Sequence, residues 1–181
     1  MKPLTLSLLS LLLSSMITAQ QQAITEPVVG GQIGLLGIWA YSEMPTGYKT
    51  VIRGEVGADL GLAGGSFSGQ TDYALVPSLT LSPRWYYNLW RRADRGRSTT
   101  KNAADFLSLR TTFNPGTILI STDRNLTAYT GLAVLPSWGI RRYWGGVSFE
   151  TGAGLGYRWQ WNDRGYRDSG VGAGIYLRFG I

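Results

Sequence analysis

The fold class is decided by the last stretch of the chain, Val171-Gly-Ala-Gly-Ile-Tyr-Leu-Arg-Phe-Gly-Ile181. Its odd positions are all apolar, whereas its even positions hold glycines, Tyr176 and Arg178. Because side chains alternate between the two faces of a strand, one face is continuously apolar and the other carries the polar groups. A chain that ends on this pattern with an apolar residue predicts the closing strand of a membrane β-barrel.

Seven further segments are expected strands, and with the last they make an antiparallel up-and-down transmembrane β-barrel of about eight strands. They are residues 28–41, 49–62, 73–88, 104–113, 117–121, 127–141 and 147–161. In six of the eight strands, the ionisable side chains of the central span fall opposite the apolar set. On the lipid face an arginine at mid-depth costs about 2–4 kcal/mol, so these charges are expected in the lumen. They are Arg53, Glu55, Asp59, Arg84, Arg110, Arg141, Glu150, Arg158 and Arg178.

Aromatic residues should form two girdles if the first strand starts at the periplasm and the strands alternate in direction. The outer girdle would hold Trp39, Tyr41, Tyr48, Trp85, Tyr87, Tyr129, Tyr157, Trp159 and Trp161. The periplasmic girdle would hold Tyr73, Phe113, Trp138, Trp144, Phe149 and Phe179. A soluble lipocalin-like barrel or sandwich shows the same alternation with its apolar face inside, and it stays the alternative. The girdles and the apolar C-terminus favour the membrane.

The two ends of the chain indicate export to the bacterial outer membrane. Residues 1–19 resemble a cleaved signal peptide, with Lys2 before a short apolar run and Ala19 at the cleavage point. Residues 20–27 would be a periplasmic lead-in, and residues 28–181 the barrel. At the other end, one set of residues resembles the signal that the outer-membrane assembly machinery reads. This set is Gly174, Leu177, Phe179 and Ile181.

The composition excludes several kinds of chemistry. The chain of 181 residues has no cysteine and no histidine. It therefore lacks disulfides, thiolate metal sites, the usual general base near neutral pH and the Ser-His or Cys-His pairs of many hydrolases. No catalytic, cofactor-binding or metal-binding residue is expected. The sequence predicts a protein that is not an enzyme, and a lipid-modifying barrel enzyme is the least favoured interpretation.

A basic segment follows the third expected strand and accounts for much of the net charge of +6. Arginine and lysine runs can neutralise phosphates of nucleic acid, but a secreted barrel rarely meets nucleic acid. In the expected topology the segment lies at the outer surface. There it either pairs with phosphates of outer-membrane lipid and lipopolysaccharide or forms a solvated loop. Its basic residues are Arg91, Arg92, Arg95, Arg97 and Lys101.

The lumen has three possible roles. Side chains nearly fill an eight-stranded barrel, so a plug of salt bridges is the favoured interpretation. The arginines could also line a narrow anion-preferring channel. Inward glycines could make room for neighbouring side chains or leave a cavity for a small ligand; they are Gly152, Gly154, Gly156, Gly172 and Gly174.

Several strings in the second half of the chain are distinctive as sequence. They are Ser82-Pro-Arg-Trp-Tyr-Tyr-Asn-Leu-Trp-Arg-Arg92, Phe106-Leu-Ser-Leu-Arg110, Pro136-Ser-Trp-Gly-Ile-Arg-Arg142, Glu150-Thr-Gly-Ala-Gly-Leu-Gly-Tyr-Arg158 and Leu177-Arg-Phe-Gly-Ile181. With them, residues 82–181 resemble an uncharacterised family of small outer-membrane β-barrel proteins of Bacteroidetes-type, Gram-negative bacteria. The resemblance implies the fold and the location, and it transfers no functional residue. The expected function is a non-enzymatic outer-membrane protein with a structural or surface-interaction role.

Overall fold

The structure is a computed structural model that describes residues 25–64, 71–122, 129–162 and 164–181. The expected signal peptide (1–19) and most of the lead-in (20–27) lie outside these residues. The strands are β1 (Val28–Gly34), β2 (Gly37–Pro45), β3 (Thr50–Gly64), β4 (Thr71–Trp85), β5 (Asp105–Pro115), β6 (Ile120–Ser121), β7 (Thr130–Trp144), β8 (Val147–Trp161) and β9 (Arg167–Gly180). A short helix, α2 (Leu89–Asp94), and a 3-10 turn, η1 (Thr100–Asn102), lie between β4 and β5.

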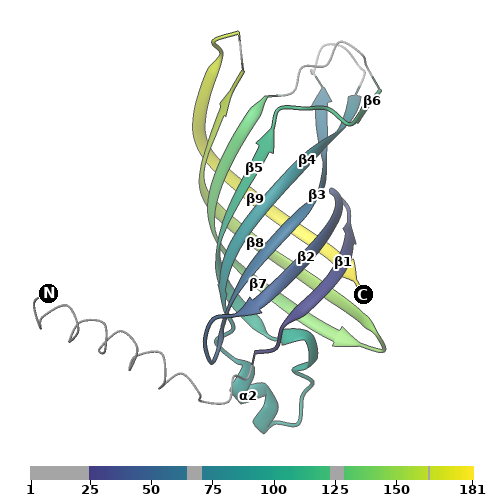
Figure 1. Ribbon diagram of the computed structural model, residues 1–181, viewed down its shortest axis with the longest axis vertical. Helices are drawn as coiled ribbons and strands as arrows, with labels where there is room; N and C mark the ends of the chain where they lie inside the picture. The colour runs from purple at the N-terminus through teal and green to yellow at the C-terminus, as the bar shows by residue number, and fades with distance from the viewer. Residues whose placement is uncertain (1–24, 65–70, 123–128, 163) are drawn as a thin grey trace, which may run out of the picture.

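The strands form one antiparallel sheet that closes on itself (Figure 1). Around the ring the order is β3-β2-β1-β9-β8-β7-β5-β4, and β4 pairs with β3 to complete the circle. Closure between the N-terminal and C-terminal strands is brief, since β1 pairs with β9 only from Gln32 to Gly34. The prediction of an all-β antiparallel fold of about eight strands is confirmed.

The first expected strand, 28–41, is wrong as a single strand. The chain reverses at Leu35 and Leu36, so this segment supplies the hairpin of β1 and β2. Glycines on both sides allow the reversal. Gly37 has a φ of +145°, and a Cβ on Gly34 would lie 2.6 Å from the carbonyl oxygen of Leu177. The sequence interpretation missed the turn because its two central residues are leucines rather than polar turn formers.

The fifth expected strand, 117–121, is also wrong as a spanning strand. β6 has two residues, and it pairs only with Ala74 and Leu75 of β4, beyond the end of the pairing between β4 and β5. The extra hairpin adds one strand and the missing spanning strand removes one, so the ring still has eight strands. The strands between these two differences, β3 to β5, run opposite to the direction expected from the sequence.

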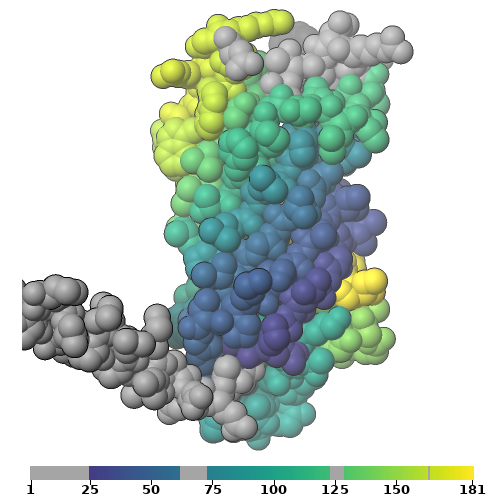
Figure 2. Space-filling view, viewed as in Figure 1, coloured from purple at the N-terminus to yellow at the C-terminus, as the bar shows by residue number. Residues whose placement is uncertain are grey.

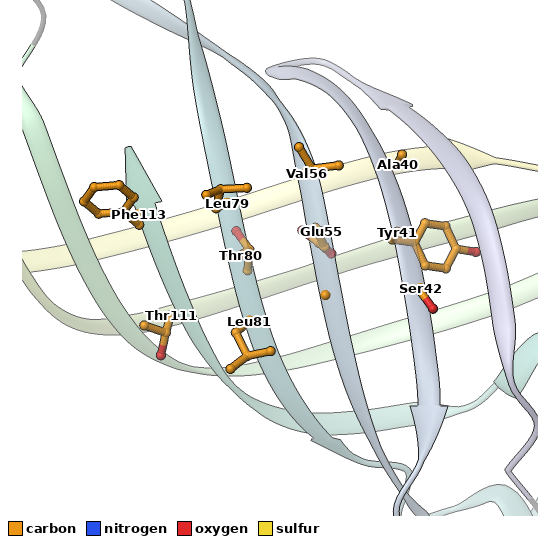
Figure 3. A pocket seen from close by; sticks show the side chains of 11 residues that line it. Ala40, Tyr41, Ser42, Glu55, Val56, Leu79, Thr80, Leu81, Thr111 and Phe113 are labelled. Carbon is orange, nitrogen blue, oxygen red and sulfur yellow. The ribbon is translucent and has the colours of Figure 1, made fainter. Parts of the chain in front are cut away.

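The wall separates apolar from charged side chains in the reverse of the usual soluble arrangement. Outward residues along neighbouring strands are exposed and apolar, among them Val56, Leu79, Leu109 and Ile175. The residues between them point inward and are buried, as Glu55 beside Val56 illustrates. Figure 2 shows one face of this closely packed wall. A shallow hollow of about 600 Å³ lies on the wall over Gly54, and Figure 3 shows the side chains that line it. The alternative with an apolar interior does not match this distribution.

The changed strand directions move several aromatic residues. Tyr48, Trp85 and Tyr87 lie at the end where β1 begins, and Tyr73 and Phe113 lie at the opposite end, the reverse of the expected girdles. Trp39 and Tyr41 are not girdle residues, because both point inward and are buried. The other girdle residues keep their expected ends: Tyr129, Tyr157, Trp159 and Trp161 at the far end, and Trp138, Trp144, Phe149 and Phe179 at the N-terminal end.

Candidate functional site

The interior of the ring holds a cluster of eight charged side chains, which we call the charged plug. Strands from all around the ring contribute to it: β2, β3, β4, β5, β7, β8 and β9. Its members are Glu43, Glu55, Glu150, Arg53, Arg84, Arg110, Arg141 and Arg178. Most of these side chains are completely buried, because small neighbours and the period-two alternation direct them to the centre.

Glu150 is one anchor of the plug. It lies 2.9 Å from Nη2 of Arg84 and 2.6 Å from Nη2 of Arg141. Arg53 Nη1 also donates to it at 3.4 Å. One carboxylate of β8 therefore binds arginines of β3, β4 and β7, and these charge-assisted bonds fix the positions of the guanidinium groups.

Glu43 is the second anchor, and the sequence analysis missed it. Its oxygens lie 3.1 Å from Nη1 of Arg53, 3.4 Å from Nη1 of Arg84 and 2.9 Å from Nη2 of Arg141. Residue 43 falls between the expected strands 28–41 and 49–62, so it is absent from the predicted lumen charges. A signal was present, since Glu43 continues the inward series begun by Trp39 and Tyr41.

Glu55 forms the upper layer of the plug, on the side away from the N-terminal end. It accepts hydrogen bonds from Arg53 Nε, from Arg178 Nη1 at 3.0 and 3.1 Å, and from Arg110 Nη2 at 3.4 Å. Arg178 also stacks on Trp39, with its guanidinium carbon 3.8 Å from the ring centroid. Such cation–π contacts stabilise desolvated arginines by about 2 kcal/mol or more.

The connection between β4 and β5, residues 86–104, seals the N-terminal end of the ring beneath the plug. The side chains of Tyr86, Leu89 and Phe106 are fully buried there. Asn102 donates to Glu43 at 2.9 Å and exchanges two hydrogen bonds with the backbone of Glu26. The segment thus closes this end of the lumen and adds a hydrogen bond from Asn102 to the plug.

Tyr86 follows β4, outside the strands, and links the seal to the plug. Its hydroxyl donates to both oxygens of Glu43 at 3.1 Å. Burial raises the pKa of this phenol, so it stays protonated and acts as a donor.

The structure brings together seven of the nine predicted lumen charges and leaves two outside the plug. Asp59 lies inside the ring but accepts a hydrogen bond from Trp39 Nε1 at 2.7 Å. Arg158 is exposed near the end opposite α2. The plug therefore contains five arginines and three glutamates, a net excess of two positive charges.

The inward glycines have two different surroundings. A Cβ on Gly152 would lie 2.5 Å from the Tyr176 hydroxyl, so this glycine makes room for that ring. Among the described residues, a Cβ on Gly174 would meet only Leu135, at 3.6 Å, and one on Gly170 would meet nothing within 4 Å. The interior is therefore filled beside Tyr176 and open along the upper part of β9.

The basic segment lies at a different end from the one expected. Arg91 and Arg92 are in α2, and Lys101 is in η1, next to Glu26 and the start of β1. Arg91, Arg95 and Arg97 are exposed, as is Trp90 beside them. The direction of β4 causes this correction, because that strand leads back to the N-terminal end.

The predicted assembly residues lie on the closing strand. Leu177, Phe179 and Ile181 point outward and are exposed, while Gly174 faces the interior. Phe149 packs against Phe179 with 5.4 Å between ring centroids.

Two further features of the described residues concern metal binding and membrane-spanning helices. They contain no group of three or more His, Cys, Asp or Glu side chains arranged to hold a metal ion. Within the same ranges, no helix has the length and the apolar character needed to cross a membrane. In comparisons with protein-family models, curated proteins and solved structures, nothing matches the chain.

Proposed function

We propose that this protein is a plugged transmembrane β-barrel of the bacterial outer membrane, without enzymatic activity and with a structural or surface-interaction role. The observation that carries the proposal is the reversed distribution of side chains. A band of exposed apolar residues surrounds a ring whose interior is charged. Exposed apolar surfaces of this extent are unfavourable in water, whereas a lipid bilayer stabilises them.

The length of the strands supports the same placement. β3, β4, β7 and β8 each have 15 residues. At about 3.3 Å per residue and a tilt of about 40°, such strands rise about 38 Å, more than the apolar band of about 25 Å in outer-membrane barrels. With the N-terminal end at the periplasm, α2 faces the inner leaflet, and the far end faces outward.

A gel-mobility assay with fractionation tests the membrane placement. The folded protein should migrate differently before and after boiling in detergent, and it should be recovered with outer membranes. An unchanged mobility together with recovery in the soluble periplasmic fraction would reject the proposal.

The charged plug favours a closed lumen over the anion-channel alternative. Arg53, Arg84 and Arg141 are completely buried together with their carboxylate partners, so side chains fill the cross-section at this level. Each plug carboxylate is bound by at least three guanidinium groups, which leaves none free for acid–base chemistry. Planar bilayers should therefore show no steady current, and a steady anion current would reject the plugged form.

In this orientation the basic segment pairs with phosphates of the inner leaflet of the outer membrane. Trp90, which is half-exposed beside Arg91, suits the interface between headgroups and hydrocarbon. Replacing Arg91, Arg95 and Arg97 by glutamine should lower retention on anionic vesicles relative to neutral ones. Equal retention on both would reject this role.

The remaining partners follow from the same placement. The barrel contacts outer-membrane lipid and, at its far end, lipopolysaccharide. The outer-membrane assembly machinery would read the closing strand through Gly174, Leu177, Phe179 and Ile181. The resemblance of residues 82–181 to small Bacteroidetes outer-membrane barrels agrees with this proposal and adds no activity to it.

A further inference from the structure

The strand pairing around the ring has a gap between β3 and β9, which we call the side slot. The hairpin of β1 and β2 ends at Leu35 and Leu36, below the top of β3 (Figure 1). β9 pairs with β1 only through Arg178, Phe179 and Gly180. Among the described residues, no strand pairs with the slot-facing edge of β9 from residue 167 to 177.

An apolar cavity lies at the base of the side slot. It has a volume of about 560 Å³ and reaches from the outer wall to inward-facing rings. Leu35 and Leu36 form one side, and Ile175 and Leu177 form another. Trp39 and Tyr176 close it toward the charged plug. The apolar outer surface therefore reaches Trp39 and Tyr176 at the base of the slot.

The interior beside the slot is also open and partly apolar. Gly170, Gly172 and Gly174 leave this part of the inner face of β9 without side chains, and no atom of the described residues lies within 4 Å of a Cβ position on Gly170. Leu135 faces this bare surface, at contact distance from Cβ positions on Gly172 and Gly174. Val76 lies on the inward face of β4, in register with Asp59. A lumen that holds only water would not need apolar side chains here.

The occupant must also supply polar groups. Backbone N–H and C=O groups along the free edge of β9 point into the slot, and such groups are costly in hydrocarbon alone. Arg158 lies beside Gly172 on the inner wall and forms no ion pair with the described residues. The site thus combines an apolar cavity, a strip of uncovered glycines, backbone hydrogen-bonding groups and a positive charge without an ion-pair partner among the described residues.

We propose that the side slot binds a membrane phospholipid, with one acyl chain in the cavity and over the glycines of β9, and its phosphate at Arg158. The ester carbonyls beside the chain accept hydrogen bonds from the free edge. This inference rests on the proposed membrane placement. The proposed lipid lies inside the ring and is distinct from the bilayer lipid that surrounds the outer wall.

Photocrosslinking tests the site in the full-length protein. The protein is reconstituted in phosphatidylcholine vesicles that contain phosphatidylglycerol with a diazirine in one acyl chain, and the labelled residues are assigned by tandem mass spectrometry. We expect labels on the outer band and also on the inward residues Leu135 and Val76. Labels on the outer band alone would overturn the inference and leave the membrane placement intact. No label on either face would contradict both.

A filled variant and a matched control make the test specific. Gly172→Leu with Gly174→Leu fills the interior, and both positions have room for a Cβ. Ala173→Leu adds the same side chain on the exposed outer face of the same strand. The filled variant should lose the inward labels and keep the outer ones, whereas the control should keep both. Inward labels that persist in the filled variant would overturn the inference. A dimer whose second copy occupies the slot, with the inward residues unlabelled, would overturn it as well.

Discussion

Neutralising Glu43 should lower the free energy of unfolding strongly. The loss should exceed that caused by neutralising any carboxylate that lies outside the charged plug. Glu43→Gln keeps the shape of the side chain but removes the charge that lies within 3.4 Å of Arg53, Arg84 and Arg141. The amide nitrogen of glutamine would also face guanidinium donors. The excess charge of the plug rises from two to three, because five arginines then face two glutamates.

The size of the effect follows from burial. Breaking a buried ion pair by removing one partner costs about 3–5 kcal/mol, because it leaves an uncompensated charge. Glu150 still contacts Arg53, Arg84 and Arg141, so the lower limit of about 3 kcal/mol applies. That corresponds to a change of about a hundredfold in the unfolding equilibrium.

Urea unfolding of the reconstituted protein, followed by tryptophan fluorescence, measures this loss. Asp94→Asn is the matched control, because it removes the same charge from an exposed position in α2. Glu43→Gln combined with Arg141→Met should recover part of the stability, since both members of a pair are then gone. The reasoning would be refuted if Glu43→Gln unfolded at the same urea concentration as the unchanged protein.

Three further predictions concern the wall and its closure. Gly139→Ala should destabilise the protein by about 1–3 kcal/mol in the same assay through overpacking, because its Cβ would lie 2.5 Å from Cζ of Phe106. Gly54→Ala is the control, since its Cβ would meet no atom of the described residues within 4 Å, and equal losses of stability in the two variants would contradict the packing argument. Leu79→Arg, on the exposed face midway along β4, should cost about 2–4 kcal/mol in lipid, and unchanged stability in vesicles would argue against a lipid-facing wall. Removing residues 175–181 deletes every pair between β9 and β1, so the truncated protein should be absent from isolated outer membranes, and its presence there would contradict a role for this strand in assembly.

The alternation of side chains in the sequence was enough to predict most of the wall. β8 has the bounds expected from sequence, and β3, β4, β5, β7 and β9 differ from expectation mainly at their ends. A period-two pattern works here because one face of each strand is apolar and exposed and the other faces a charged, buried interior. Seven of the nine predicted lumen charges meet in the plug for the same reason.

What the sequence could not predict depends on long-range packing. The reversal at Leu35 and Leu36 has no polar turn residue, and its glycines become informative only beside Leu177 and Trp39. Because the sequence does not reveal that turn, the expected directions of β3 to β5 are wrong. The basic segment with α2 is therefore expected at the wrong end, and Glu43 is absent from the predicted lumen charges. The burial of Tyr86 and Asn102 was also unforeseen, because their partners Glu43 and Glu26 lie 43 and 76 residues away.

A cysteine scan along β5 tests most directly whether the apolar face of the ring contacts lipid. The chain has no cysteine, so single cysteines at Leu107, Ser108, Leu109, Thr111 and Phe113 can each carry a fluorescent label. In vesicles of phospholipid with brominated acyl chains, labels at the outward positions 107, 109, 111 and 113 should be quenched. The label at the inward position 108, which is level with Arg84 of the plug, should not be quenched. Absence of quenching at every position would contradict a lipid-facing wall, and quenching at position 108 equal to that at the outward positions would contradict the charged plug.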